Sequence, residues 1–188
     1  IGPNKDTENQ TNDFCLGLKN FSDIADYITV NISSPNTKGL RDFHDQEKLK
    51  ELLAALNKIK KDNKTNIPLV LKVSPDIDEN DIPEIIDVVM KNNISAIILT
   101  NTTAGNRENL KDNAKNEQGG LSGEPLQQLS TNMIKKFYKL LNGKIPIIGV
   151  GGVNSGKSAY EKIVAGASLL QLYTGFVYRG PSAAKDIK

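Results

Sequence analysis

Two segments of this 188-residue sequence combine asparagine amides with hydroxyl groups directly after a short apolar run. Residues 31–37 read Asn-Ile-Ser-Ser-Pro-Asn-Thr, and residues 100–103 read Thr-Asn-Thr-Thr. An asparagine side chain offers a hydrogen-bond donor and an acceptor together, which suits a ligand that bears amides and carboxylates. Either segment alone could equally be a turn that satisfies its own backbone. Two such segments at one end of a domain favour a site for a polar, planar ligand.

A lysine, Lys72, lies inside the otherwise apolar run of residues 68–73. Lysine is almost never fully buried without a partner. The usual partners are an anion, a Schiff base or the negative edge of a cofactor. A lysine that reaches solvent from the end of a strand is the alternative. The polar residues around Lys72 favour a functional role.

Residues 151–158 read Gly-Gly-Val-Asn-Ser-Gly-Lys-Ser and match the P-loop pattern letter for letter. A P-loop would make the chain a nucleotide-binding hydrolase that uses Lys157 and Ser158. Two observations argue against this alternative. Only one apolar run follows the motif, and none of the apolar runs ends in an acidic residue that could hold magnesium. We favour a glycine-rich turn whose amides, with the helix N-terminus behind Ser155, bind a phosphate. A second glycine-rich segment, residues 119–123, could close the same pocket.

Five short apolar runs alternate with amphipathic stretches along the chain. The runs are rich in branched residues and hardly alternate, which is typical of strands buried on both faces of a parallel sheet. The amphipathic stretches repeat apolar residues at helical spacing. The predicted strands cover residues 27–32, 68–73, 96–100, 146–150 and 169–173. The predicted helices cover residues 12–19, 49–59, 82–90, 126–141 and 159–164.

Consecutive strand–helix units with short connections predict an α/β fold with parallel strands and right-handed crossovers. A doubly wound sheet and a (β/α)8 TIM barrel both fit this order. Polar residues follow every predicted strand, which favours the barrel over a sheet with a single switch point. The last two strand–helix loops of a barrel build its phosphate site. These loops are at Gly151-Gly152 and at Tyr173-Thr174 here.

Composition narrows the possible functions further. The net charge of +2 gives no strong field for nucleic acid, and no run approaches the roughly 20 apolar residues of a membrane span. The single cysteine, Cys15, excludes an internal disulfide and a cysteine zinc cage, and we expect it to be buried in a helix. We expect His44 to be a solvated loop residue, Asp76 a loop or helix-entry residue, and no metal site. A phosphorylated cofactor is then expected to supply the chemistry.

Taken together, these motifs resemble the class 2, quinone-reducing dihydroorotate dehydrogenases. The matching segments stand in the order and spacing of that family over almost the whole chain. They are residues 25–27, 31–41, 71–76, 100–103, 119–123, 146–152, 165–168 and 171–174. The resemblance implies an FMN-dependent oxidation of (S)-dihydroorotate to orotate, with a quinone as electron acceptor, in pyrimidine biosynthesis.

The resemblance also implies that residues 1–188 are the C-terminal portion of one FMN-binding barrel domain, with its last five strand–helix units. The first three strands and a membrane-associated N-terminal region would lie outside this sequence, which begins at Ile1 without an initiator methionine. We expect two exposed sheet edges as a result. Dihydroorotate, orotate and a quinone are the implied partners, with no nucleic acid. Peripheral association with a bacterial or mitochondrial inner membrane is also implied.

Each site residue takes a role from the resemblance. Ser34 would be the catalytic base that removes the C5 proton, and class 1 enzymes carry cysteine at this position. Lys72 would stabilise negative charge on the reduced flavin. The implied FMN contacts are Asn31, Lys72, Thr100, Gly123, Gly152, Tyr173 and Thr174. The implied orotate contacts are Asn31, Asn36, Asn101 and Thr102.

Overall fold

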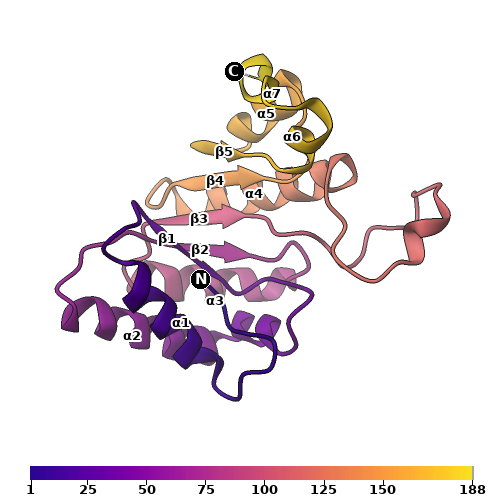
Figure 1. The fold of residues 1–188 in the computed structure, drawn as a ribbon. Helices are drawn as coiled ribbons and strands as arrows, with labels where there is room; N and C mark the ends of the chain where they lie inside the picture. The colour runs from indigo at the N-terminus through magenta and orange to yellow at the C-terminus, as the bar shows by residue number, and fades with distance from the viewer. Residues whose placement is uncertain (188) are drawn as a thin grey trace.

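A computed structural model describes residues 1–187, apart from the side chain of Ala114. Five parallel strands form one sheet in sequence order, as Figure 1 shows. The strands are β1 (Ile28–Asn31), β2 (Leu69–Val73), β3 (Ala96–Leu99), β4 (Ile147–Val150) and β5 (Leu169–Gln171). All five predicted strands are confirmed, each slightly shorter than predicted, and the α/β fold class with parallel strands is confirmed with them.

Helices follow or precede each strand, and the five predicted helices are all present. They are α1 (Gln10–Phe21), α2 (Gln46–Asp62), α3 (Ile82–Lys91), α4 (Gln127–Leu141) and α5 (Gly156–Val164). Two short helices, α6 (Thr174–Arg179) and α7 (Ala183–Ile187), follow β5. Short 3-10 turns are η1 (Leu40–His44), η2 (Glu79–Asp81), η3 (Asn113–Asn116) and η4 (Glu124–Leu126).

Local side-chain contacts explain where the main helices begin and end. The Asp45 carboxylate accepts a hydrogen bond from the amide of Lys48 at the start of α2. Such a cap satisfies an amide that has no partner inside the helix. At its other end, α4 stops at Asn142, which takes the left-handed conformation that commonly terminates helices. The ends of these helices are therefore set by local chemistry as well as by burial.

The two faces of the sheet bury different sets of residues. One face packs against α1–α4 and holds the larger core, with Val30, Leu71 and Ile97 at its centre. The opposite face carries a smaller cluster of Val70, Ala96, Ile98 and Ile148, with Val150 packed against it. Strand register places Val70 beside Ala96 and Ile98 beside Ile148, so these side chains share a face. Apolar residues are thus needed on both faces, which explains the lack of alternation in the strands.

The outer edges of the sheet differ. At β1, the amino group of Ile1 donates to the carbonyl of Thr29 at 2.7 Å, and the amide of Asn31 donates to the carbonyl of Ile1 at 3.0 Å. This is the hydrogen-bond pattern of a parallel pair. Among residues 1–187, no strand pairs with the outer edge of β5, and Leu169 there is 63% exposed. The predicted exposed edge is confirmed at β5, whereas Ile1 covers part of the edge at β1.

A buried lysine joins the two helices that flank β4. Lys162 of α5 is fully buried, and its ammonium donates to Ser130 Oγ at 3.0 Å, Thr131 Oγ1 at 3.2 Å and the carbonyl of Gln127 at 3.4 Å. These acceptors are neutral. Burial therefore lowers the pKa of Lys162 to about 8, against the smaller opposing effect of the neighbouring Glu161. The amine holds α5 on the first turn of α4.

Replacing Lys162 with methionine should change how the free energy of unfolding depends on pH. The unfolded chain keeps this proton up to the ordinary pKa of 10.5, whereas the folded protein releases it above about 8. Between these values the folded wild-type protein becomes more stable as pH rises, and the residue adds no pH dependence below them. Across this window the stability difference between wild type and Lys162→Met changes by at most about 3.5 kcal/mol, at about 1.4 kcal/mol per pKa unit. Urea titrations across this window check it, and identical pH profiles for both proteins would contradict it.

Candidate functional site

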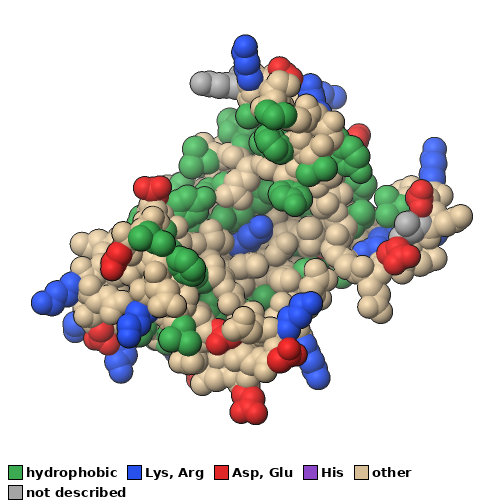
Figure 2. All heavy atoms as spheres, in the orientation of Figure 1, with side chains coloured by type: hydrophobic (Ala, Val, Ile, Leu, Met, Phe, Trp, Pro, Cys, Tyr) green, Lys and Arg blue, Asp and Glu red, His purple; other side chains and the backbone are tan. Residues whose placement is uncertain are grey.

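A cavity of about 1150 Å³ opens at the carboxyl ends of the strands. Figure 2 shows the molecule hollowed on the side turned to the viewer. The end of β2 contributes Lys72, and the loops after β3, β4 and β5 contribute the remaining walls, as expected for parallel strands whose ends meet at one edge. Eight predicted site residues line this cavity: Lys72, Thr100, Asn101, Thr102, Gly123, Gly152, Tyr173 and Thr174. The predicted residues Asn31, Ser34 and Asn36 are not among its lining residues.

The two asparagine-rich segments meet at the ends of β1 and β3. Asn31 Oδ1 accepts hydrogen bonds from Ser33 Oγ at 2.9 Å and from Asn101 Nδ2 at 3.2 Å. Asn101 Nδ2 also donates to Ser33 Oγ at 2.9 Å, and Asn101 Oδ1 accepts from the amide of Thr102 at 2.8 Å. Asn31 does not line the cavity itself, but it is hydrogen-bonded to Asn101, which does. Each segment also satisfies part of its own backbone, as the turn alternative expects, but their side chains additionally bond to each other and form one network.

Within residues 1–187, two side-chain amides in the first asparagine-rich segment remain without a partner. Among the described residues, Asn31 Nδ2 and the side-chain amide of Asn36 have no hydrogen-bond partner. Thr100 is buried, and its hydroxyl donates to the carbonyl of Asn101 at 3.0 Å. The two asparagine-rich segments thus combine side chains that are fixed by hydrogen bonds with two free amide donors, as a site for a flat polar ring requires.

Ser34 lies on the turn between β1 and η1, and its side chain is partly buried. Its Oγ accepts a hydrogen bond from the amide of Asn36 at 3.2 Å. Asn36 lines a second cavity of about 980 Å³, together with Lys5 and Arg107. Within residues 1–187, no histidine, lysine or carboxylate side chain hydrogen-bonds the Ser34 hydroxyl. A basic role for Ser34 therefore needs a proton acceptor beyond its hydrogen-bond partners in this structure.

Lys72 reaches the cavity from the end of β2. Its side chain is half-buried, and burial lowers the pKa of its ammonium below the ordinary value. In the described part of the chain, Lys72 Nζ has neither a hydrogen-bond acceptor nor an ion-pair partner. A partly desolvated cation without a counter-ion is costly unless a ligand supplies negative charge. Lys72 is therefore a candidate contact for an anionic ligand edge.

The turn after β4 approaches α4 so closely that it requires glycine. Gly152 has φ +75°, and a Cβ added there would lie 2.6 Å from the Gln127 Cα. Among the described residues, the amides of Gly152 and Val153 have no hydrogen-bond partner. Unpaired amides at a glycine turn are suited to an anion such as a phosphate.

The second glycine-rich segment closes the same cavity, as predicted. Thr174 Oγ1 at the start of α6 donates to Ser122 Oγ at 2.9 Å. A Cβ on Gly123 would lie 3.1 Å from Thr174 Cγ2, so these two loops are in direct contact. Gly123, Gly152 and Thr174 therefore surround one end of the cavity.

Only part of the helix N-terminus behind Ser155 is free for a ligand, and a phosphate contact there stays a prediction. Within residues 1–187, the amides of Gly156 and Lys157 have no hydrogen-bond partner. Ser158 Oγ accepts from the amides of Asn154 and Ser155, each at 3.0 Å, and Ser155 Oγ accepts from the amide of Ser158 at 3.2 Å. This reciprocal capping box occupies three of the amides that a P-loop would direct at phosphates. Lys157 is exposed and lines neither cavity.

His44 was expected to be solvated, and this expectation is wrong. Its Nε2 accepts a hydrogen bond from the amide of Ser74 at 3.4 Å. Burial lowers the pKa of His44 to about 4, so the ring is neutral at physiological pH.

Cys15 is partly buried and packs against the core, and burial raises the pKa of its thiol. Asp76 lies in the loop after β2, as expected, and its side chain binds two other segments of the chain.

Several cavity residues were not identified from the sequence. Gln171, Asn154 and Arg179 line the cavity, and an Arg179 guanidinium nitrogen donates to the carbonyl of Asn154. Asn154 lies inside the motif of residues 151–158 and Gln171 begins the matching segment of residues 171–174, but neither was given a role, and no motif surrounds Arg179. In residues 1–187, no helix is long and apolar enough to cross a membrane. No group of three or more His, Cys, Asp or Glu side chains in that range is placed to bind a metal.

Comparison with known proteins gives a consistent result. A family described as dihydroorotate dehydrogenase matches residues 1–188. The dihydroorotate dehydrogenase (quinone) of Christiangramia forsetii is 46% identical over 189 residues, which cover 100% of this chain and 55% of the relative. The corresponding protein of Vibrio parahaemolyticus is 45% identical over 195 residues and is covered to 57%. The mitochondrial dihydroorotate dehydrogenase (quinone) of Arabidopsis thaliana is 42% identical over 193 residues and is covered to 42%.

Solved structures agree with these relatives. The crystal structure of DHODH in complex with ferulenol from Eimeria tenella matches with a TM-score of 0.94 and 35% identity. The match covers 100% of this chain and 55% of that one. The ligand-free DHODH from the same organism gives a TM-score of 0.92 and 36% identity, over 98% of this chain and 56% of that one. The chain thus spans about half the length of the relatives it matches.

Replacing Gly152 with alanine should destabilise the protein more than the same change at Gly143. Both residues have φ near +74°, but a Cβ at Gly143 would meet nothing within 4 Å. Gly143→Ala should cost about 1 kcal/mol from backbone strain. Gly152→Ala should cost about 1–3 kcal/mol more, because the new methyl group overlaps Gln127. Denaturant unfolding of both variants measures this, and equal losses would contradict the close approach.

Proposed function

The chain belongs to the dihydroorotate dehydrogenase family, and we propose that it carries the flavin and orotate sites of an enzyme that oxidises (S)-dihydroorotate to orotate. We propose a quinone as the electron acceptor, as the names of its relatives state for those proteins. The observation that supports the proposal most is the joined Asn31–Asn101 network beside the unpartnered Lys72. Because the chain spans about half the length of its relatives, the activity proposed for the whole protein rests on its similarity to them.

We further propose that residues 1–188 are the C-terminal portion of a single FMN-binding (β/α)8 barrel, with its last five strand–helix units. The five-stranded parallel sheet matches a barrel of this family over part of its length. The unpaired edge of β5 and the small apolar cluster around Ile98 support this arrangement. In a closed barrel, that cluster would face the interior and the edge would be paired.

FMN fits the cavity on the chemistry of its walls. The unpaired amides of Gly152 and Val153, next to Gly123 and Thr174, suit the phosphate group. Tyr173 and Thr174 would add amides from the first turn of α6. When bound, FMN would supply the acceptor for the hydride that leaves C6 of dihydroorotate. Lys72 would hold negative charge at one flavin edge, with Asn31 and Thr100 also in contact with the ring.

The asparagine network would bind the substrate. Asn31 and Asn36 have free amide donors for the carbonyl and carboxylate oxygens of orotate. Asn101 and Thr102 would complete the contacts, with Asn101 held in place by its bonds to Asn31 and Ser33. A side chain fixed in this way loses little freedom on binding, so it orients the ring efficiently.

Ser34 would take the proton from C5 of dihydroorotate. Serine is a weak base at its free pKa, so the hydroxyl must pass its own proton to a water or a second hydroxyl as the C5 proton arrives. The amide of Asn36, which donates to Ser34 Oγ at 3.2 Å, favours negative charge on that oxygen. The turn that holds Ser34 therefore supports its role.

The location proposed for the whole protein is peripheral association with an inner membrane, through a region outside residues 1–188. A quinone acceptor is lipid-soluble, which motivates this location. The relatives include bacterial proteins and one whose name states that it is mitochondrial.

Ser34→Ala should slow flavin reduction by dihydroorotate by about 100-fold or more at neutral pH, as expected for the loss of a general base. The FMN content of the full-length protein should not change, because Ser34 lies outside the main cavity. Stopped-flow absorbance measures the rate, and the flavin spectrum measures the content. An unchanged rate would show that Ser34 is not the base.

Lys72→Met should lower the same reduction rate by about 10- to 100-fold, because a preorganised positive charge is lost. Lys157→Ala is the matched control, since this exposed lysine lines neither cavity. Flavin reduction should be normal in the control. If Lys157→Ala instead lost ATP binding while Lys72→Met kept a normal rate of flavin reduction, the P-loop alternative would be supported.

A further inference from the structure

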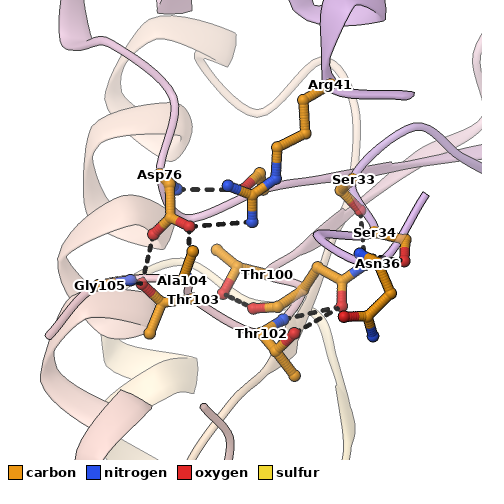
Figure 3. Close-up of polar contacts among 12 residues, drawn as sticks. Ser33, Ser34, Asn36, Arg41, Asp76, Thr100, Thr102, Thr103, Ala104 and Gly105 are labelled. Atoms are coloured by element: carbon orange, nitrogen blue, oxygen red, sulfur yellow. Dashed lines mark hydrogen bonds and ion pairs between the residues drawn. The ribbon is translucent and has the colours of Figure 1, made fainter. Parts of the chain in front are cut away.

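Asp76 connects three segments of the chain, although the proposed chemistry does not use it. Figure 3 shows its carboxylate between Arg41, Thr103 and Ala104. The Thr103 hydroxyl donates to Asp76 Oδ1, and the amide of Ala104 donates to Oδ2 at 2.8 Å. Arg41 Nη2 lies 3.0 Å from Oδ2. One side chain after β2 thus binds both η1 and the segment after β3.

The segments joined by Asp76 carry the proposed substrate residues. Thr103 and Ala104 directly follow Asn101 and Thr102, which belong to the asparagine network. Arg41 lies in η1, at the end of the turn that begins with Ser34. The Asp76 carboxylate therefore couples the position of the proposed base to that of the proposed orotate contacts.

The two side chains of the ion pair are partly buried. The side chains of Arg41 and Asp76 are 30% and 21% exposed, respectively. Arg41 Nε is buried and has no hydrogen-bond partner among the described residues. Losing Asp76 would leave this guanidinium partly desolvated and without a counter-charge, which favours displacement of η1.

A second contact joins the same two segments. The amide of Ser74 donates to His44 Nε2 at 3.4 Å, and the amide of Asp76 donates to Ser74 Oγ at 3.2 Å. His44 also belongs to η1, so η1 is docked on the turn after β2 at two points. This second contact keeps η1 attached when the ion pair is removed. Variants of the ion pair should consequently shift the loops without unfolding them.

We propose that Asp76 and Arg41 are positioning residues that set the distance between Ser34 and the Asn101–Thr102 contacts. The inference rests on the proposed function and deepens it. Both residues act through others, since neither Asp76 nor Arg41 lines the main cavity. A shift of about 1 Å in such a site can cost about 100-fold in rate.

Asp76→Asn and Arg41→Gln in the full-length, flavin-loaded protein test the proposal. Each variant should raise KM for dihydroorotate and lower the flavin reduction rate, with a combined loss in kcat/KM of about 10- to 100-fold. FMN content should stay at the wild-type level. The double variant should be no worse than the more impaired single variant, because both changes break one contact.

Matched controls come from the other ion pair of η1. Lys48 Nζ lies 3.3 Å from Asp42 Oδ2, with side chains 54% and 61% exposed, and this pair does not reach the segment after β3. Lys48→Gln and Asp42→Asn make the same charge changes and should leave kcat/KM within twofold of wild type, as expected for exposed pairs.

Thr103 provides a test that keeps all charges. Thr103→Val removes the hydroxyl that donates to Asp76 and should lower kcat/KM, whereas Thr103→Ser should recover most of that loss. This pair decides the question if the Asp76 variant does not fold. Normal kcat/KM in Asp76→Asn and Thr103→Val, or a loss fully explained by lower FMN content, would overturn the inference. Absence of dihydroorotate-dependent reduction in the wild-type protein would instead overturn the proposed function.

Discussion

The parallel register of the sheet is the constraint on which the site depends. Asn31 pairs with Lys72, and Lys72 pairs with Ile98, so the ends of neighbouring strands stay level. The amide of Thr100 donates to the carbonyl of Val150 at 3.0 Å, which ties the end of β3 to the end of β4. Parallel strands place every carboxyl end at one edge, so the polar residues that follow them gather there. Segments far apart in the sequence thereby become one cavity.

Burial then gives the cavity its chemistry. Lys72 is partly desolvated and has no partner in the described residues, which makes a negative ligand edge favourable beside it. Asp76 and Lys162, by contrast, have their polar contacts inside the protein and act on loops and helices. A charged side chain without a partner, such as Lys72, is therefore available to a ligand. One whose partners lie inside the protein, such as Asp76 or Lys162, holds neighbouring segments in place.

Much of this arrangement was predictable from the sequence because burial and turn chemistry leave regular patterns. The strands and main helices follow from branched runs and helical spacing, and the two asparagine-rich segments follow from their place after strands. The buried amine of Lys162 left no such pattern, since it lies in a helix between Glu161 and Ile163. The bonds of His44 and Asp76 join segments about 30 residues apart, so they depend on tertiary packing. The same holds for the capping box at Ser155, which resembles a P-loop in its letters and differs in its hydrogen bonds.

A crystal structure of the full-length protein with FMN and orotate would show whether one cavity at the strand ends holds both molecules. We expect the phosphate against the amides of Gly152 and Thr174, the Lys72 ammonium at a flavin edge, and orotate against Asn31 and Asn101. A phosphate held instead by Lys157 and the amides of residues 156–158, or a flavin away from Lys72, would show that the site is not built in this way.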